Sequence, residues 1–593
     1  MSKLRANMQI GTGAQPGAGT QSRTGTQLRA CACPRKNGSM RMRFLGVLVC
    51  AIVLTVVAVL TAIPATACAA QTGSITVGGT TATKYNAYQL FDATVTDKGA
   101  KKIATDVDWA NAAVRDAVLP VLHAAGLGSK ATSAEDAAEW LNADGHMTGT
   151  LAMKLARAMK KAGTKPTALT ANTPATLVSG YWLIIADDDV IGESQAGTAP
   201  IFAVVGGADV AVTPKAATPE VKKHVLEDST NAWQKAADAT VADDLYWRLS
   251  ATVPAGLTSY DAYHVQFVDT MSAGLDPSRV VQSARVYVAP GTAGGFNAVT
   301  TKDGIAATDA AAGWTDITES STVRVNTQNN TFTVRTADLV AALGTDAFAT
   351  GTRVVVVYNA PLGTSANHCT AKGNPNEVYL RYPRSPFADQ SGDAGFTRTP
   401  SDDATAYTWD LVLTKRGSDG DKPLAGAKLR IIDDRGRALN AHGAWQMDGK
   451  ASVTTGADGR VTVSGVDSGK LTVEELEAPK GYERMGGSRT ITIAIEGLDV
   501  KQVAAAKPKF TITAEKPLRA DSADAQTGTV EASLVNTPST PPVLPVTPPN
   551  IIRRFMPATG DQAMAVVGVV ALAGVAALAV ALLIKRGGGS HKG

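Results

Sequence analysis

Two long stretches of this 593-residue chain alternate polar and apolar residues with a period of two. They cover residues 220–386 and 406–537, and Gly, Pro, Asn and Asp interrupt them at short intervals. Successive side chains of a strand point to opposite faces, so this pattern predicts half-buried strands joined by turns. The sequence therefore favours a mainly β chain with tandem Ig-like β-sandwich domains.

Residues 71–213 mix strand patterns with helical spacing. Apolar residues recur at helical intervals in 108–127 and 151–161, and the run 132–135 (Thr-Ser-Ala-Glu) is a capping box for a helix through Trp140. Residues 75–91 fit strands, or a strand and a short helix, and strand patterns occupy 181–185 and 201–212. We expect an α+β domain ahead of the sandwiches.

Both ends of the chain carry apolar runs. Residues 44–63 follow Arg41 and Arg43 and precede a small-residue stretch at 65–70, which predicts a secretory signal peptide and a mature chain that starts near Gln71. Residues 563–584 are uncharged and apolar and precede a basic pair at 585–586, which predicts a transmembrane helix with a cytoplasmic end.

Cysteine and charge exclude several classes of protein. Four of the five cysteines fall in the leader, so only Cys369 remains and no intramolecular disulfide is expected. The net charge of +4 is supplied by the two ends, so we expect no nucleic-acid partner. The histidines lack metal-ligand spacing, and no phosphate loop or nucleophile elbow is present. We therefore expect no metal, no cofactor and no turnover enzyme.

In the second alternating stretch, three strands each place one polar residue on an apolar face. Lys415 shares a face with Leu413, Glu475 with Val473, and Asn536 with Leu534. Burial favours the neutral amine of a lysine and the neutral acid of a glutamate, and a neutral amine is a nucleophile. Glu475 could then handle protons while Lys415 displaces ammonia from Asn536, in a single self-crosslinking event.

Such an amide would join the first strand of this domain to the last. The loop that it closes is about 120 residues long, and a disulfide of that span contributes about 4–5 kcal/mol by constraining the unfolded chain. The alternative is that no bond forms. In that case Lys415 extends its side chain at a strand end and pairs with Glu475, while Asn536 caps a strand.

The first alternating stretch shows the same arrangement with a different acid. Lys223, Asp269 and Asn376 each lie on the apolar face of a strand. Lys222 and Asn374 are close competitors, and only the alternation argues against them.

Two sets of motifs resemble known families. Residues 424–427 (Leu-Ala-Gly-Ala), 458–459 (Asp-Gly) and 475–482 (Glu-Leu-Glu-Ala-Pro-Lys-Gly-Tyr) resemble the collagen-adhesin B-type repeat of Gram-positive pilins and adhesins, in which Lys, Glu and Asn form an isopeptide bond. Residues 267–275 and 374–380 resemble the isopeptide-forming middle domain of fimbrial backbone subunits. The second resemblance implies a bond between Lys223 and Asn376, with Asp269 as the acid that handles the proton.

Two further motifs resemble assembly signals. Met556-Pro557-Ala558-Thr559-Gly560, followed by the apolar run and the basic tail, resembles the Leu-Pro-x-Thr-Gly sorting signal, with Met556 in the Leu place. The resemblance implies that a sortase cuts after Thr559 and passes its carbonyl to an amine.

The run 213–215 (Thr-Pro-Lys) resembles the pilin motif of shaft subunits, although the upstream Trp is absent. The resemblance implies that Lys215 is the acceptor between subunits. A solvated linker lysine is the alternative.

We therefore expect six segments: a leader and signal peptide (1–70), an α+β pilin domain (71–215), an isopeptide-forming middle domain (216–390), a B-type sandwich (400–537), a proline-rich spacer (538–555) and the sorting signal, membrane helix and tail (556–593).

The resemblance implies the major shaft subunit of a sortase-assembled pilus, secreted and anchored to the Gram-positive cell wall. The expected partners are pilus-type and housekeeping sortases, other copies of the chain, minor pilins, peptidoglycan and host surface or matrix ligands. The alternative is a monomeric wall-anchored adhesin or a tip or minor subunit that binds a host ligand.

Overall fold

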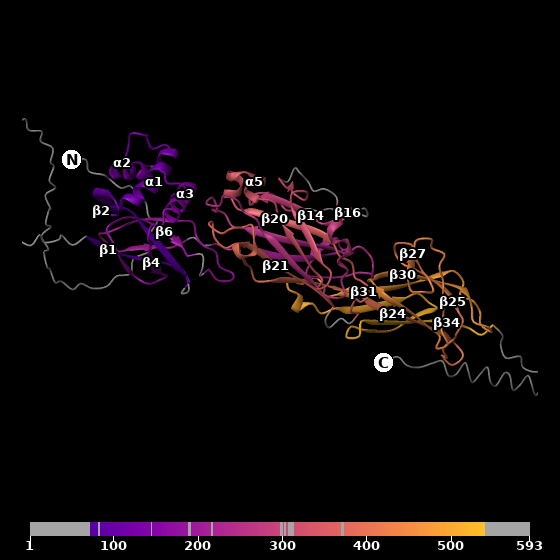
Figure 1. The fold of residues 1–593 in the computed structure, drawn as a ribbon. Helices are drawn as coiled ribbons and strands as arrows, with labels where there is room; N and C mark the ends of the chain where they lie inside the picture. Colours follow the sequence, from indigo (N-terminus) through magenta and orange to yellow (C-terminus); the bar gives the residue numbers. More distant parts are fainter. Residues whose placement is uncertain are drawn as a thin grey trace, which may run out of the picture.

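The computed structural model describes residues 71–80, 83–143, 145–187, 191–214, 217–296, 300–301, 304–305, 313–368 and 373–539. The signal peptide, the sorting signal, the apolar run 563–584, Lys215 and Cys369 lie outside these residues. None of the helices in the described ranges is long and apolar enough to cross a membrane. Three units follow one another along the chain (Figure 1), and the fold is mainly β behind an α+β unit, as the alternation predicted.

The first unit holds a sheet of order β3-β2-β6-β7, with β4 paired to β2, and a smaller sheet of order β5-β1-β8. Its strands are β1 (Thr72–Val77), β2 (Lys84–Lys98), β3 (Lys101–Trp109), β4 (Thr167–Thr170), β5 (Ala175–Val178), β6 (Gly180–Ala186), β7 (Ile201–Val205) and β8 (Val210–Val212). Every residue of β6 is buried, because one face of the larger sheet packs on the helices and the other on the smaller sheet.

Three helices cover the first unit: α1 (Ala112–Ala124), α2 (Ala134–Asn142) and α3 (Gly149–Lys161). Each begins at a side chain that accepts a backbone N–H, namely Asn111, Ser133 and Thr148. The sequence placed the first helix at 108–127, but β3 continues to Trp109 and α1 starts only after Asn111. The error arises because apolar residues at the end of a strand fit a helical spacing by chance.

The second unit is a sandwich of two sheets. One has the order β10-β9-β12-β20-β14-β17, and the other has the order β11-β23-β21-β13-β19-β18, with β22 paired to β21. The apolar faces of both sheets form one core. The strands are β9 (Glu220–Glu227), β10 (Ala232–Gln234), β11 (Ala236–Asp238), β12 (Tyr246–Val253), β13 (Gln266–Met271), β14 (Arg285–Pro290), β17 (Thr315–Asp316), β18 (Thr322–Asn326), β19 (Thr331–Arg335), β20 (Thr352–Asn359), β21 (Asn374–Pro383), β22 (Phe396–Arg398) and β23 (Asp402–Tyr407).

Short elements decorate this sandwich. They are β15 (Thr300–Thr301) and β16 (Gly304–Ile305), the helices α4 (Val280–Ser283), α5 (Leu339–Leu343) and α6 (Thr345–Ala349), and the 3₁₀ turns η2 (Pro277–Arg279) and η4 (Asp393–Gly395).

The third unit is also a sandwich, with sheets of order β29-β24-β34-β33 and β27-β26-β25-β30-β31-β32, and with β28 paired to β25. The strands are β24 (Trp409–Gly417), β25 (Lys428–Ile432), β26 (Ala438–Leu439), β27 (Trp445–Gln446), β28 (Val453–Thr454), β29 (Arg460–Val466), β30 (Gly469–Glu477), β31 (Ser488–Glu496), β32 (Lys509–Ala514), β33 (Leu518–Asp524) and β34 (Thr529–Asn536); η5 (Val503–Ala505) precedes β32. The first strand, β24, pairs in parallel with the last, β34.

The boundary between the two sandwiches differs from the predicted one. The sequence placed residues 400–407 with the third domain, but β23 pairs with β21 and belongs to the second unit. Only Thr408 separates β23 from β24. No turn residue marks the boundary, because one extended segment passes from one sandwich directly into the next.

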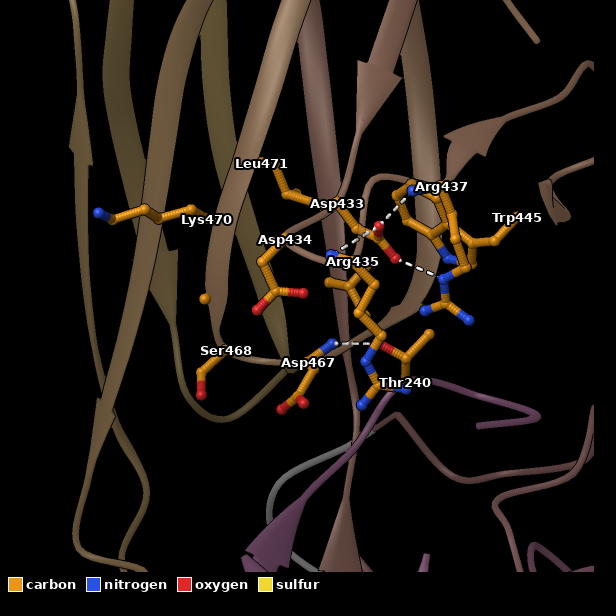
Figure 2. A pocket seen from close by; sticks show the side chains of 12 residues that line it. Thr240, Asp433, Asp434, Arg435, Arg437, Trp445, Asp467, Ser468, Lys470 and Leu471 are labelled. Atoms are coloured by element: carbon orange, nitrogen blue, oxygen red, sulfur yellow. Dashed lines mark hydrogen bonds and ion pairs between the residues drawn. The ribbon is translucent and has the colours of Figure 1, made fainter. Parts of the chain in front are cut away.

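The joint between these sandwiches is held by paired polar groups. Arg437 contacts both carboxylate oxygens of Asp243, and Arg435 Nη1 lies 2.9 Å from Asp243 Oδ2. Thr240 of the second unit accepts the backbone N–H of Asp467, and the two residues lie side by side in the pocket at this joint (Figure 2). The bidentate contact of Arg437 and the single contact of Arg435 both reach the carboxylate of Asp243, and these charge-assisted bonds hold the two sandwiches in one relative orientation.

Candidate functional site

The predicted lysine, acid and asparagine of the second unit lie together in its core. Lys223 on β9, Asp269 on β13 and Asn376 on β21 all have 0% exposed surface. Asn376 lies opposite Met271 in the pairing of β13 with β21, whereas Lys223 pairs with Leu249 in the facing sheet. The lysine thus reaches across the core from one sheet to the acid and amide of the other.

A tyrosine joins these three side chains. Lys223 Nζ donates to Asp269 Oδ2 and, at 2.9 Å, to the hydroxyl oxygen of Tyr358. The same hydroxyl donates to Asp269 Oδ2 at 3.0 Å and accepts from Asn376 Nδ2 at 2.9 Å. The lysine and amide nitrogens therefore both contact one oxygen atom.

Burial pushes this site toward neutral groups. It lowers the pKa of Lys223 to about 8, against the opposing attraction of Asp269, and it raises the pKa of Asp269. Asp269 Oδ1 and Asn376 Oδ1 are buried and have no hydrogen-bond partner among the described residues. If Asp269 carries a proton on Oδ1, that O–H becomes a donor for an oxygen that has no partner, such as Asn376 Oδ1.

The backbone of Lys223 is fixed on both sides. Its N–H donates to Asp402 Oδ2 at 2.7 Å, and its carbonyl accepts from the buried Lys235 Nζ at 2.8 Å. Lys235 also pairs with Asp402 at 2.5 Å, so β9 and β23 are tied together beside the reactive side chain.

The structure separates the expected residues from their competitors. The Lys222 side chain is 52% exposed and pairs with Glu220 at the surface. Asn374 is buried, but its amide is held by the backbone of Asn367 and by the carbonyl of Ala406. Lys222 and Asn374 are therefore not brought together with Asp269.

The third unit contains a second buried set. Lys415 on β24 and Glu475 on β30 have 0% exposed surface, and Asn536 at the end of β34 is 3% exposed. Lys415 lies opposite Leu534, and Asn536 lies opposite Gly417, on the same face of the sheet. Glu475 approaches them from the facing sheet.

Here the acid contacts the amide directly. Asn536 Nδ2 donates to both carboxylate oxygens of Glu475, at 2.9 and 3.0 Å, and Lys415 Nζ lies 3.7 Å from Glu475 Oε1. Burial lowers the pKa of Lys415 to about 8, against the attraction of Glu475. Asn536 Oδ1 has no hydrogen-bond partner among the described residues. The backbone N–H of Met485 donates to Glu475 Oε2 at 2.6 Å and holds the carboxylate in place.

Tyr358 and Lys235 were not predicted from the sequence. In β20, Tyr358 shares a face with Val354 and Val356, but residues 354–357 are all valine, so no polar–apolar alternation indicated which face points inward. A tyrosine on an apolar face usually completes a core, and nothing in the sequence indicates which buried polar groups its hydroxyl meets.

The first unit differs from the two sandwiches. Within its described residues no lysine is buried, so it holds no third set of this kind. The described residues also contain no group of three or more His, Cys, Asp or Glu placed to bind a metal ion. Lys215 and the five residues 556–560 lie outside the described ranges, so the predicted acceptor lysine and sorting signal stay predictions from the sequence.

Comparisons with known proteins identify part of the chain. Residues 410–507 match the family model of the SpaA prealbumin-like fold domain. Over 161 residues the chain is 28% identical to the trypsin-resistant surface T6 protein of Streptococcus pyogenes serotype M6, and the match covers 26% of this chain and 28% of that protein.

Three solved structures resemble the chain at low identity. They are the T6 backbone pilin of Streptococcus pyogenes (17% identity, 79% of this chain and 98% of that chain, TM-score 0.43), the major pilin SpaD of Corynebacterium diphtheriae (15%, 79% and 98%, 0.37) and the major pilin SpaA of the same organism (13%, 79% and 100%, 0.35). Residues 410–507 thus match a SpaA prealbumin-like fold domain, and part of the chain is similar to a streptococcal surface protein.

Proposed function

We propose that this chain is the shaft subunit of a covalently polymerised pilus on the cell surface, stabilised by two internal Lys–Asn amide bonds. The observation that carries the proposal is the burial, in each sandwich, of a lysine amine with one acid and one asparagine amide. Burying such groups without a partner or a reaction is costly, and a crosslink removes the charge of the lysine permanently.

The reaction in the second unit begins with a proton transfer from Lys223 to Asp269. The neutral Nζ then attacks Cγ of Asn376, the bond from Cγ to Nδ2 breaks, and ammonia leaves. The products are one secondary amide and one ammonia for each amine and carboxamide consumed. Each of the two bonds would form once per chain, so the proposed chemistry involves no enzymatic turnover.

The reaction in the third unit also uses a lysine amine, an acid and an asparagine amide, but here the acid contacts the amide and not only the amine. Glu475 contacts the leaving nitrogen of Asn536 and lies beside Lys415, so one carboxyl group can accept a proton from the amine and donate one to the leaving ammonia. The resulting bond would link β24 to β34.

Assembly uses the two segments outside the described residues. A sortase would cut after Thr559, and Lys215 of the next subunit would attack the acyl-enzyme. One donor and one acceptor per subunit give a head-to-tail contact that does not close, so the product is a filament. A housekeeping sortase would finally attach the filament to peptidoglycan.

Mass spectrometry and a denaturing gel test the proposal. The purified ectodomain should be lighter than its calculated mass by two ammonia masses, and boiled wall extracts should show a ladder of high-mass species. A full calculated mass would refute the internal bonds. A single band in place of the ladder would favour the monomeric adhesin.

A further inference from the structure

The leaving nitrogen in the second unit needs a proton, and the acid does not contact it. Asp269 is hydrogen-bonded to Lys223 Nζ and to the hydroxyl of Tyr358. Asn376 Nδ2 donates to the hydroxyl oxygen of Tyr358 at 2.9 Å. In the third unit, by contrast, both oxygens of Glu475 lie within 3.0 Å of Asn536 Nδ2.

We propose that Tyr358 is a catalytic proton relay that carries a proton from Lys223 to the leaving nitrogen of Asn376 during amide formation. The relay rests on the proposed crosslink between Lys223 and Asn376. In the second unit, Asp269 would accept the first proton of the amine and Tyr358 would deliver a proton to the leaving nitrogen. The third unit needs no such second group, because Glu475 contacts the leaving nitrogen itself.

The hydroxyl is positioned for this role on each side. Its oxygen lies 2.9 Å from both the attacking and the leaving nitrogen. The ring is buried and packs edge-on against Phe332, with centroids 4.6 Å apart, so the hydroxyl is held in one place. Burial raises the pKa of Tyr358 well above its usual value, so the group stays protonated and exchanges protons without carrying charge.

The proton transfers balance as follows. Attack of the Nζ lone pair on Cγ gives an intermediate with a positive Nζ and a negative carboxamide oxygen, which the protonated Asp269 stabilises. Once Cγ is tetrahedral, Nδ2 has a lone pair, and the hydroxyl turns its O–H from Asp269 to Nδ2. Nζ then passes a proton to the tyrosine oxygen while the hydroxyl passes its own proton to Nδ2. The bond from Cγ to Nδ2 then breaks, ammonia takes the bonding pair, and the carbonyl re-forms. Tyr358 ends with the proton count with which it began.

Tyr358→Phe tests the relay in the full-length chain. Newly made protein is pulse-labelled and digested at successive times, and mass spectrometry measures the fraction of the peptide pair from Lys223 and Asn376 that is crosslinked. General acid–base catalysis contributes 10²–10⁴-fold, so we expect formation to slow by about 100-fold or more. Formation of the Lys415–Asn536 bond in the same molecules should keep its rate.

Tyr382→Phe is the matched control. Tyr382 is also fully buried in the second unit, and its hydroxyl donates to Gln195 O at 3.2 Å, away from the lysine. This variant should crosslink at the wild-type rate. Slowing of both variants to the same extent would overturn the relay, because loss of any buried hydroxyl would then explain the effect.

Two further outcomes separate the relay from the crosslink itself. Wild-type protein without the Lys223–Asn376 bond would refute the proposed bond and with it the relay. Wild-type and Tyr358→Phe proteins that crosslink equally fast would refute the relay alone. Fluorotyrosine at position 358 keeps the ring and the hydroxyl but changes its acidity, and an unchanged rate in that protein would also refute the relay, even if the phenylalanine variant folds poorly.

Discussion

Lys415 and Asn536 lie on neighbouring parallel strands with an offset of two residues, so that Lys415 faces Leu534 and Asn536 faces Gly417 across the pair. The two strands are the first and the last of their sandwich. Tension along the chain enters at the start of β24 and leaves at the end of β34. An amide between the two side chains would carry that tension directly and bypass the residues between them.

The choice between Asn374 and Asn376 can be tested by matched alanine variants. Asn376→Ala should retain one ammonia mass, because the carboxamide that reacts is gone. Asn374→Ala should still form the bond but lose about 1–3 kcal/mol of stability, since backbone groups of Asn367 and Ala406 lose their partner. Intact mass and chemical denaturation measure the two effects. A crosslink that survives Asn376→Ala would contradict the assignment.

Removal of Glu475 should stop the bond in the third unit. Glu475→Ala leaves Lys415 buried without its acid, so we expect the chain to regain one ammonia mass and to lose about 3–5 kcal/mol of stability. Glu475→Gln is the control for shape, because it fills the same space without a titratable proton. This variant should also remain uncrosslinked. If it still loses two ammonia masses, as the wild type does, the acid is dispensable.

Polymer formation should depend on one lysine and one threonine. Lys215→Ala should abolish the ladder but leave a wall-anchored monomer, because the sorting signal is intact. Thr559→Ala should remove both polymer and anchoring. Lys222→Ala, an exposed lysine nearby, is the matched control and should assemble normally. A full ladder from Lys215→Ala cells would mean that another lysine is the acceptor.

Arg437 should be more important for the joint than an exposed arginine. Arg437 and Asp243 are 14% and 8% exposed, and breaking a buried pair costs about 3–5 kcal/mol. We expect Arg437→Ala to destabilise the two sandwiches and to expose residues 236–243 to limited proteolysis. Arg519→Ala removes an exposed pair with Asp421 and should change stability by less than about 1 kcal/mol. Equal effects of the two changes would argue against a rigid joint.

Stability should fall as the pH rises from about 4.5 to 7. Burial, together with the nearby Asp238, raises the pKa of Glu227 from 4.5 to about 7. In this window the folded chain holds a proton that the unfolded chain has lost, so the free energy of unfolding decreases with pH, on the order of 3 kcal/mol in total. Glu227→Gln should flatten this slope in denaturation curves measured at several pH values. If Glu227→Gln leaves the pH dependence of the free energy of unfolding unchanged, another titratable group causes that dependence.

The fold class and the inward position of the reactive side chains follow from local sequence pattern. Period-two alternation fixes which face each strand residue occupies, so Lys415, Glu475 and Lys223 could be placed in a core before any strand was paired. The start of α2 is likewise local, although its cap is Ser133, which accepts the N–H of Asp136, and not Thr132 as the capping box over 132–135 predicted.

Which buried groups meet depends on how the strands pair and the sheets pack. Asn374 and Asn376 lie on the same face of β21, so the alternation used against Asn374 could not separate the two, and only the structure shows that Asn374 is held by backbone while Asn376 lies in the site. Nor could alternation show that Tyr358 bridges amine and amide, that Asp402 and Lys235 hold the backbone of Lys223, or that β23 belongs to the second sandwich. These contacts join residues far apart in the chain, and their existence depends on how two sheets pack, which local sequence pattern does not encode.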